Sequence, residues 1–177
     1  FMLLFDRVVE LLNAVYRSSV TDGLTHLYNR RYFMARLENA LKSGKPVGAI
    51  FCDIDNFKKL NDTQGHHRAD GVLKQVAEII AQETQGIGLA GRYGGEELVA
   101  FVVGPKTLLK KTADAIRQRT EEESIVTVSV GICHAPPGKA IAAEKLMRLA
   151  DEAMYYSKTS GKNRVTDYSL MRLEKDV

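Results

Sequence analysis

One run of residues constrains the fold of this chain more than any other. Val47 to Ile54 read Val-Gly-Ala-Ile-Phe-Cys-Asp-Ile, a mostly apolar stretch rich in strand-forming residues. A continuous apolar run of this length predicts a buried strand. The run ends on Asp53-Ile54-Asp55, so two carboxylates lie at the end of a core strand.

The segments on either side of this run predict helices and strands in alternation. Apolar periodicity, capping residues and glycine or proline breaks predict six helices, over about 1–15, 30–42, 56–60, 71–80, 105–123 and 143–160. Asn29 is the expected cap of the second helix and Asp70 of the fourth, and a break is expected at 61–65. Further strands are expected over 89–93, 97–103, 125–133 and 165–168, with a Gly-Gly turn between the first two. This order predicts an α/β (α+β) fold with a mixed, largely antiparallel sheet flanked by helices.

Composition excludes several classes of protein. The chain has 177 residues, and Lys+Arg 25 against Asp+Glu 22 leaves a net charge of +3, too small to indicate nucleic-acid binding through bulk charge. No apolar run approaches the roughly 20 residues of a membrane helix, and no signal peptide is recognisable. The two cysteines exclude a disulfide scaffold. We therefore expect a reduced, cytoplasmic domain with no nucleic-acid partner and no membrane segment in this stretch, whether or not the parent protein is membrane-anchored.

The N-terminal residues have a heptad spacing. Apolar side chains follow one another at intervals of 3, 4, 3 and 4, at Phe1, Leu4, Val8, Leu11 and Val15. Two heptads suit either a helix packed on its own domain or the end of a linker helix from an upstream sensor, and the turn-rich break at 18–23 favours the linker. We expect a linker or signalling helix over 1–20 and one domain over 21–177. Because the sequence begins at Phe1 rather than Met, we expect a fragment of a longer protein or a trimmed form of it.

Two groups of carboxylates are candidates for chemistry. Strand alternation places Asp53 and Asp55 on the same face, and carboxylate oxygens suit Mg²⁺. Gly94-Gly95-Glu96-Glu97 separates two expected strands; its glycines permit positive φ and close approach of a ligand, and its adjacent carboxylates repel unless a cation is near. Taken singly, an exposed strand end and a solvated hairpin would also explain the two motifs.

Together the two motifs predict a site. A hairpin beside the first strand would bring Glu96 near Asp53 and create a cluster of carboxylates at one sheet edge. Four cations accompany these segments in the sequence, namely Lys58, Arg92, Lys158 and Lys162. Hard oxygen ligands combined with cations indicate phosphates bridged by Mg²⁺.

Five segments in colinear order closely resemble the GGDEF family of diguanylate cyclases. The resemblance extends from about Thr21 to Val165. Five matches in the same order are not expected by chance. The segments are 92–98 (Arg-Tyr-Gly-Gly-Glu-Glu-Leu), 22–31, 53–62 with Gly65, His66 and Asp70, 128–132, and 150–155 with Lys158 and 161–164.

This resemblance implies a fold, an activity and partners. The fold would be like the palm of nucleotidyl cyclases and polymerases. The family condenses two GTP molecules into cyclic di-GMP and pyrophosphate with Mg²⁺ (or Mn²⁺), and two domains must meet as a homodimer with their sites facing each other. The alternatives are a non-catalytic GGDEF-like domain that binds GTP or cyclic di-GMP as a receptor, and a pure dimerisation domain.

The resemblance also implies the role of individual residues. It makes Glu96 both a metal ligand and the general base for the 3′-hydroxyl. The implied metal ligands are Asp53, the Ile54 carbonyl, Glu96 and Glu97. The implied substrate contacts are Asn61 and Asp70 with guanine, His66, Gly94 and Gly95, and Lys58, Lys158 and Lys162 with phosphates.

Four positions depart from the family pattern. Gln85 and Gly88 stand where the family often has an Arg-x-x-Asp inhibitory site, so we predict no product-inhibition site of that type. Leu98 replaces a common Phe, and we expect the core to accept it. Ala69 stands where Gly is common, and would cost about 1 kcal/mol if its φ had to be positive, with a shift of Asp70.

Overall fold

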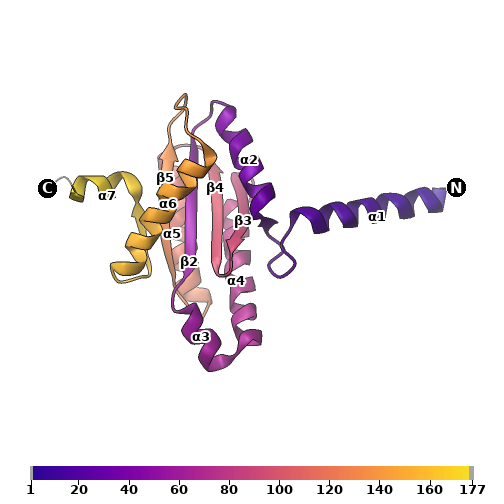
Figure 1. Ribbon diagram of the computed structural model, residues 1–177, viewed down its shortest axis with the longest axis horizontal. Helices are drawn as coiled ribbons and strands as arrows, with labels where there is room; N and C mark the ends of the chain where they lie inside the picture. The colour runs from indigo at the N-terminus through magenta and orange to yellow at the C-terminus, as the bar shows by residue number, and fades with distance from the viewer. Residues whose placement is uncertain (1, 176–177) are drawn as a thin grey trace.

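The computed structural model describes residues 2–175, and their side chains through Met171. The chain forms a mixed sheet of six strands with helices on both faces, and one helix projects from the body (Figure 1). The elements are α1 (Met2–Val20), β1 (Tyr28–Asn29), α2 (Arg30–Lys42), β2 (Val47–Ile54), α3 (Phe57–Gln64), α4 (His66–Thr84), β3 (Gly88–Gly94), β4 (Glu97–Val103), α5 (Lys106–Glu123), β5 (Val128–Ala135), α6 (Ala143–Thr159), β6 (Arg164–Asp167) and α7 (Tyr168–Lys175).

The apolar run from Val47 to Ile54 is the central strand. The strand order is β1-β3-β4-β2-β5-β6, and every residue of β2 is buried. β2 pairs antiparallel with both β4 and β5, β3 and β4 form an antiparallel hairpin, and the outer pairs β1–β3 and β5–β6 are parallel. The predicted fold class is therefore confirmed.

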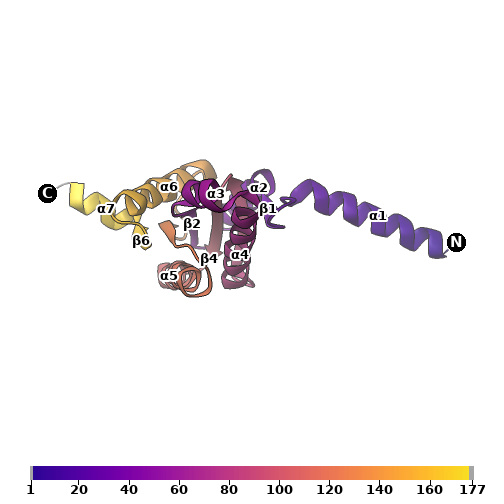
Figure 2. The same ribbon diagram turned by 90° about the horizontal axis from the view of Figure 1, so that it is seen from below.

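Helices cover both faces of the sheet (Figure 2). On one face, α4 and α5 bring Leu73, Ile80 and Ile116 into a core cluster with side chains of β2. On the other face, α2 and α6 bring Phe33 and Leu146 into a second cluster. Because β2 contributes to both clusters, it needs apolar residues on both of its faces, which explains its continuous apolar run.

The region after β2 differs from the predicted one. α3 continues to Gln64, across the break expected at 61–65, and α4 begins at His66 rather than after Asp70. Gly65 makes the sharp turn between the two helices with φ +82°. Asp70 therefore lies inside a helix, and its predicted role as a cap is wrong.

Two of the departures from the family pattern cause no strain. Ala69 lies inside α4, is 1% exposed, and is not among the residues of positive φ. Its backbone therefore carries no glycine-specific cost, and Asp70 is not displaced for that reason. Leu98 is fully buried in the core, as expected.

The N-terminal helix is longer and more isolated than the sequence indicated. α1 continues through Ser18 and Ser19 to Val20, the only buried residue of the helix, so the break expected at 18–23 begins too early. Phe1, the first residue of the heptad pattern, lies outside the described residues. Leu4, Leu11 and Val15 are each about two-thirds exposed. Reading this helix as packed along its own domain is therefore wrong for the described residues.

Other element boundaries shifted slightly. β5 begins at Val128 rather than Ile125, because Ser124 Oγ and the 124–127 segment form a local turn with hydrogen bonds to Val126 and Thr120. β1 and α7 were not predicted from sequence; the first has only two residues, too few for a periodic signal.

Within residues 2–175, no helix has both the length and the apolar character needed to cross a bilayer.

Candidate active site

The sheet brings the predicted carboxylates together. Asp53 near the end of β2 pairs with Glu97 at the start of β4. The β3–β4 hairpin therefore places Glu96, in the turn, beside the same strand end, and Asp53 and Glu96 are close enough to interact electrostatically. Ile54 lies one residue past the last β2–β4 pair and pairs only with Val128 of β5.

These carboxylates share a crowded, partly buried environment. Burial raises the pKa of Asp53, which is 6% exposed, and the charges of Glu96 and Asp55 add to the rise. Burial also raises the pKa of Glu97, and there Asp151, Asp53 and Glu96 contribute. Burial, and to a smaller extent repulsion between the carboxylates, thus disfavours the charged forms of Asp53 and Glu97, and a bound cation would favour them.

Lys158 on α6 supplies one positive charge to this cluster. Its Nζ donates a hydrogen bond of 2.7 Å to Asp53 Oδ1. Burial lowers the pKa of the Lys158 ammonium, but the hydrogen bond and charge of Asp53 outweigh it, and the pKa is raised overall. Lys158 is therefore charged at neutral pH and forms an ion pair with Asp53, a candidate metal ligand.

The donor chemistry of the site fits a hard divalent cation. Among the residues described, no three His, Cys, Asp or Glu side chains are arranged so that they would ligate a metal as they stand. The oxygens of Asp53, Glu96 and Glu97 are nevertheless the type that Mg²⁺ and Mn²⁺ prefer, and such sites are completed by water and substrate phosphates. Asp53 Oδ1 is shared with Lys158, so a cation would compete with that ammonium or bind beside it.

The other candidate cations have different surroundings. Lys162 Nζ donates to Asn56 Oδ1 at 2.6 Å, just beyond the end of β2, and Lys58 is exposed on α3. Arg92 is already engaged: its guanidinium donates to both oxygens of Asp22 at 2.9 and 3.1 Å and to the Gly95 carbonyl at 2.8 and 3.1 Å. Arg92 therefore ties the hairpin turn to the segment that follows α1, a role that the sequence reading did not assign to it.

Asp22 accepts the hydrogen bonds of Arg92 with an ionised carboxylate. Burial alone would raise the pKa of its carboxyl, but hydrogen bonds from Thr25 and Arg92 lower it overall. Both side chains of the pair are about one-fifth exposed. The connection therefore joins the base of α1 to the turn that carries Glu96.

The predicted guanine contacts lie on α3 and α4, two consecutive helices that contact each other; α3 lies beyond the end of β2, and α4 runs along one face of the sheet (Figure 1). Asn61 is on α3, His66 is the first residue of α4, and Asp70 is one turn further along. Asn61 Oδ1 is buried and accepts no hydrogen bond from any described residue. An unsatisfied buried acceptor costs about 1–3 kcal/mol, which a ligand that donates a hydrogen bond would recover.

Of the two roles that the sequence suggested for the hairpin glycines, positive φ and close approach of a ligand, the first is wrong. Neither Gly94 nor Gly95 is among the residues of positive φ, so the turn does not need glycine for its backbone conformation. A Cβ on Gly94 would meet Glu97 Oε2 at 2.8 Å, and one on Gly95 would meet open space. The remaining reason for glycine at position 95 is close approach of a ligand, which is consistent with a substrate contact there.

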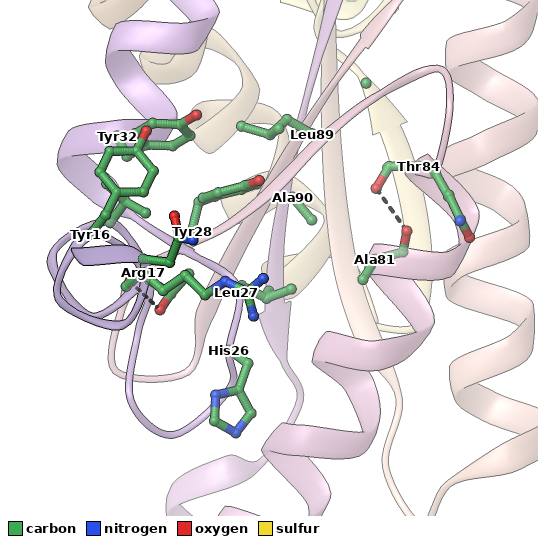
Figure 3. A pocket seen from close by; sticks show the side chains of 15 residues that line it. Tyr16, Arg17, His26, Leu27, Tyr28, Tyr32, Ala81, Thr84, Leu89 and Ala90 are labelled. Carbon is green, nitrogen blue, oxygen red and sulfur yellow. Dashed lines mark hydrogen bonds between the residues drawn. The ribbon is translucent and has the colours of Figure 1, made fainter. Parts of the chain in front are cut away.

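A pocket of about 670 Å³ lies away from the carboxylates, at the junction of α1 with the domain (Figure 3). Tyr16, Arg17 and Tyr32 are among the residues that line it, and Tyr28 stacks on Tyr32 with ring centroids 4.6 Å apart. No Asp, Glu or Lys lines this pocket. The groups suited to phosphate and metal chemistry are at the end of β2, so the candidate active site is there.

Most of the chain is similar to one protein family. Residues 19–164 match the family described as "Diguanylate cyclase, GGDEF domain". The response regulator PleD of Caulobacter vibrioides is 40% identical over 164 residues, which cover 83% of this chain and 36% of PleD. Diguanylate cyclase DosC of Escherichia coli is 32% identical over 169 residues, 88% of this chain and 37% of DosC. The chain thus spans about a third of the length of these relatives.

Solved structures show the same fold. The coiled coil and GGDEF domain of DgcB from Caulobacter crescentus, in complex with c-di-GMP, superposes with a TM-score of 0.84 at 32% identity, over 94% of each chain. The active GGEEF domain of a diguanylate cyclase from Vibrio cholerae has a TM-score of 0.72 at 29% identity, over 80% of this chain and 97% of that one.

The class that fold and sequence define is that of nucleotidyltransferase-type cyclase domains. Within that class, the chain belongs to the GGDEF family of diguanylate cyclase domains.

Proposed function

We propose that this domain condenses two GTP molecules into cyclic di-GMP and pyrophosphate in the cytoplasm, with Mg²⁺ or Mn²⁺. One observation carries the proposal: the β2–β4 register gathers Asp53, Glu96 and Glu97 at one strand end, with Lys158 directly on Asp53. This chain, which belongs to a family of cyclase domains, has both an acidic cluster and a neighbouring cation. A scaffold domain has no need of either.

The roles follow from the chemistry of phosphoryl transfer. Asp53, the Ile54 carbonyl, Glu96 and Glu97 would hold the metal, which offsets the charge of the triphosphate and of the leaving pyrophosphate. Glu96 accepts the proton of the 3′-hydroxyl as that oxygen forms its bond to the α-phosphorus. The bond from the α-phosphorus to the bridging oxygen breaks in line, and pyrophosphate leaves.

Substrate binding is assigned to cations and to a base-reading pair. Lys58, Lys158 and Lys162 would face the phosphates, while Gly94 and Gly95 allow them close to the hairpin. Asn61 and Asp70 would read guanine, with His66 as a further contact. The orphaned acceptor at Asn61 Oδ1 supports this assignment, since guanine presents N–H donors where adenine does not.

Two copies are needed for one product. Each domain would hold one GTP, so two sites must face each other in a homodimer. The exposed heptad side chains of α1, among them Leu4, Leu11 and Val15, would pair two copies as a linker over residues 1–20 that receives a signal from an upstream sensor. The DgcB structure that this chain resembles is described as a coiled coil with a GGDEF domain, which supports this arrangement.

We propose further that the domain lacks product inhibition at an Arg-x-x-Asp site. Gln85 and Gly88 stand at those positions. A Cβ at Gly88 would collide with the Phe101 carbonyl, so an aspartate does not fit there without a backbone shift. Initial rates titrated with cyclic di-GMP test this, and non-competitive inhibition at sub-micromolar product would contradict it.

Incubation of the protein with GTP and Mg²⁺ at high protein concentration, followed by chromatography for cyclic di-GMP, tests the main proposal. Product that disappears on chelation of the metal and in Glu96→Ala supports it. Binding of GTP or cyclic di-GMP with no turnover under any condition would favour the receptor alternative instead.

A further inference from the structure

The second aspartate at the end of β2 has surroundings unlike the first. Strand alternation placed Asp53 and Asp55 on one face as two carboxylates, and the family resemblance implied a metal role for Asp53 without giving Asp55 any role. Asp55 is 3% exposed. It accepts hydrogen bonds from Ser129 Oγ at 2.6 Å, Thr127 Oγ1 at 2.7 Å and the Asn163 backbone N–H at 3.0 Å. Three of its roughly four acceptor positions are therefore filled by the protein itself, which leaves little for a metal.

One of these bonds reaches a strained turn. Gly161, Lys162 and Asn163, between α6 and β6, have φ values of +116°, +62° and +45°. Two of the three are not glycine, and a left-handed conformation costs such residues on the order of 1 kcal/mol or more each unless their surroundings hold them there. The bond from the Asn163 N–H to the buried Asp55 carboxylate is a charge-assisted hydrogen bond that holds this turn against the end of β2.

Other bonds complete the turn and aim its lysine. Lys162 N–H donates to the Ser157 carbonyl at 2.9 Å, and Arg117 Nη1 donates to Asn163 Oδ1 at 3.1 Å. With its own N–H and the following residue Asn163 held by these bonds, Lys162 extends its Nζ to Asn56 Oδ1 at 2.6 Å. Asn56 follows Asp55 directly and is itself left-handed, with φ +56°. Lys162 is thus folded back over the end of the strand that bears Asp53.

We propose that Asp55 is a positioning residue and not a metal ligand: it clamps the 161–163 turn in a left-handed conformation, and thereby places the Lys162 ammonium to receive the phosphates of the substrate. The role of Lys162 rests on the proposed function, whereas the clamp itself does not. The same carboxylate ties the turn to β2 and β5, so the cation is held against the sheet that carries the acidic cluster.

Asp55→Asn tests the clamp without any nucleotide. The amide side chain keeps the shape but replaces one acceptor oxygen with a donor. Amide hydrogen exchange followed by NMR should show at least about tenfold faster exchange at Asn163, since a charge-assisted bond is lost. Asp167→Asn is the matched control: Asp167 is a buried aspartate at the end of β6 that accepts hydrogen bonds from Ser169 and pairs with Lys106, away from the turn. Unchanged exchange at Asn163 in Asp55→Asn, or equal acceleration in the control, would overturn the clamp.

Inorganic tripolyphosphate with Mg²⁺, titrated by calorimetry, tests the link to Lys162. Asp55→Asn and Lys162→Ala should each weaken binding by about five- to tenfold, and the double variant should bind no more weakly than Lys162→Ala alone, because both changes remove the same contact. Additive losses, or no tripolyphosphate binding by the unchanged chain, would overturn the phosphate role. A midpoint for Mg²⁺ that shifts in Asp55→Asn as far as in Asp53→Asn would show Asp55 to be a ligand.

These outcomes separate the inference from the proposed function. A chain that makes no cyclic di-GMP, yet shows the exchange and tripolyphosphate effects, retains the clamp and its lysine while the cyclase proposal fails. A chain that makes cyclic di-GMP, but whose Asp55→Asn variant exchanges Asn163 normally, retains the cyclase proposal while the inference fails.

Discussion

Two turns place candidate site residues at the same end of the central strand β2 by opposite means. The β3–β4 turn contains Gly94 and Gly95, yet neither glycine has positive φ. The 161–163 turn contains one glycine and has three consecutive residues of positive φ. The first turn carries Glu96 and is tied by Arg92 at its surface, while the second carries Lys162 and is held by the buried Asp55. Glycine content is therefore a poor guide to where a backbone is strained, and a buried hydrogen-bonded side chain can hold a conformation that glycine would otherwise provide.

The largest expected effect is the loss of turnover in a variant of Glu96, and it distinguishes this residue of the first turn from Lys162 of the second. Glu96→Gln should lower kcat by about 10²–10⁴-fold, because the proton acceptor is lost. Lys162→Ala should mainly raise KM for GTP, because it removes a phosphate contact. Steady-state kinetics at saturating Mg²⁺ measure both. If Glu96→Gln changes only KM, the base assignment is wrong.

Removing the contacts of Arg92 with Asp22 and with the Gly95 carbonyl should have a smaller effect. Arg92→Ala removes the bonds to Asp22 and Gly95, and should lower the free energy of unfolding by about 1–2 kcal/mol, discounted because the pair is partly exposed. Urea unfolding measures this. Because the Asp22 pKa is lowered, its contribution is present above the usual aspartate range and is lost as the pH falls through the lowered value. Arg31→Ala, at an exposed position of α2, is the control.

The acidic cluster gives a prediction of opposite sign. Burial and neighbouring carboxylates raise the pKa of Glu97, so its charged form destabilises the folded state above its unfolded pKa. Glu97→Gln should therefore raise the Tm at pH 7.5 by about 1–3 °C, with the gain shrinking as the pH falls toward 4. Mg²⁺ should raise the Tm of the unchanged chain more than that of the variant. A lower Tm for Glu97→Gln at pH 7.5, in metal-free buffer, would contradict the raised pKa.

The smallest expected effect concerns the glycines themselves. Gly95→Ala should change the Tm by less than about 1 °C, since φ is not positive and a Cβ there meets nothing within 4 Å. Its KM for GTP should nevertheless rise if phosphates approach the turn closely. Asn163→Ala serves as the counterpart in the other turn and should destabilise more, because it keeps the left-handed strain and loses the bond from Arg117. Equal stability of the two variants would remove the contrast between the turns.

Sequence patterns predicted much of this arrangement. The bounds of β2 and β4 and the Asn29 cap of α2 agree with the structure, where Asn29 accepts from the Tyr32 N–H. The hairpin was correctly expected beside β2, which brings Glu96 near Asp53. These predictions rest on local periodicity and on capping chemistry, which a single sequence displays directly.

Long-range contacts explain the failures. Nothing local distinguishes Asp53 from Asp55, and only pairing with β5 and the turn before β6 surrounds Asp55 with donors 72 to 108 residues away. Arg92 looked like a free cation because its partner Asp22 is 70 residues distant. Asp70 resembled a cap until Gly65 proved to turn the chain five residues earlier.

The sequence by itself determined which segments form the sheet and its helices, and which chemical groups lie at the ends of the central strands, because both are written in apolar spacing and residue type. Only the tertiary structure decided which of those groups are left to meet a ligand. Hydrogen bonds within the protein occupy Asp55 and Arg92, whereas burial and neighbouring carboxylates leave Asp53 and Glu97 with raised pKa values beside Glu96. That division depends on distances between residues far apart in the chain, and these exist only once the sheet has formed.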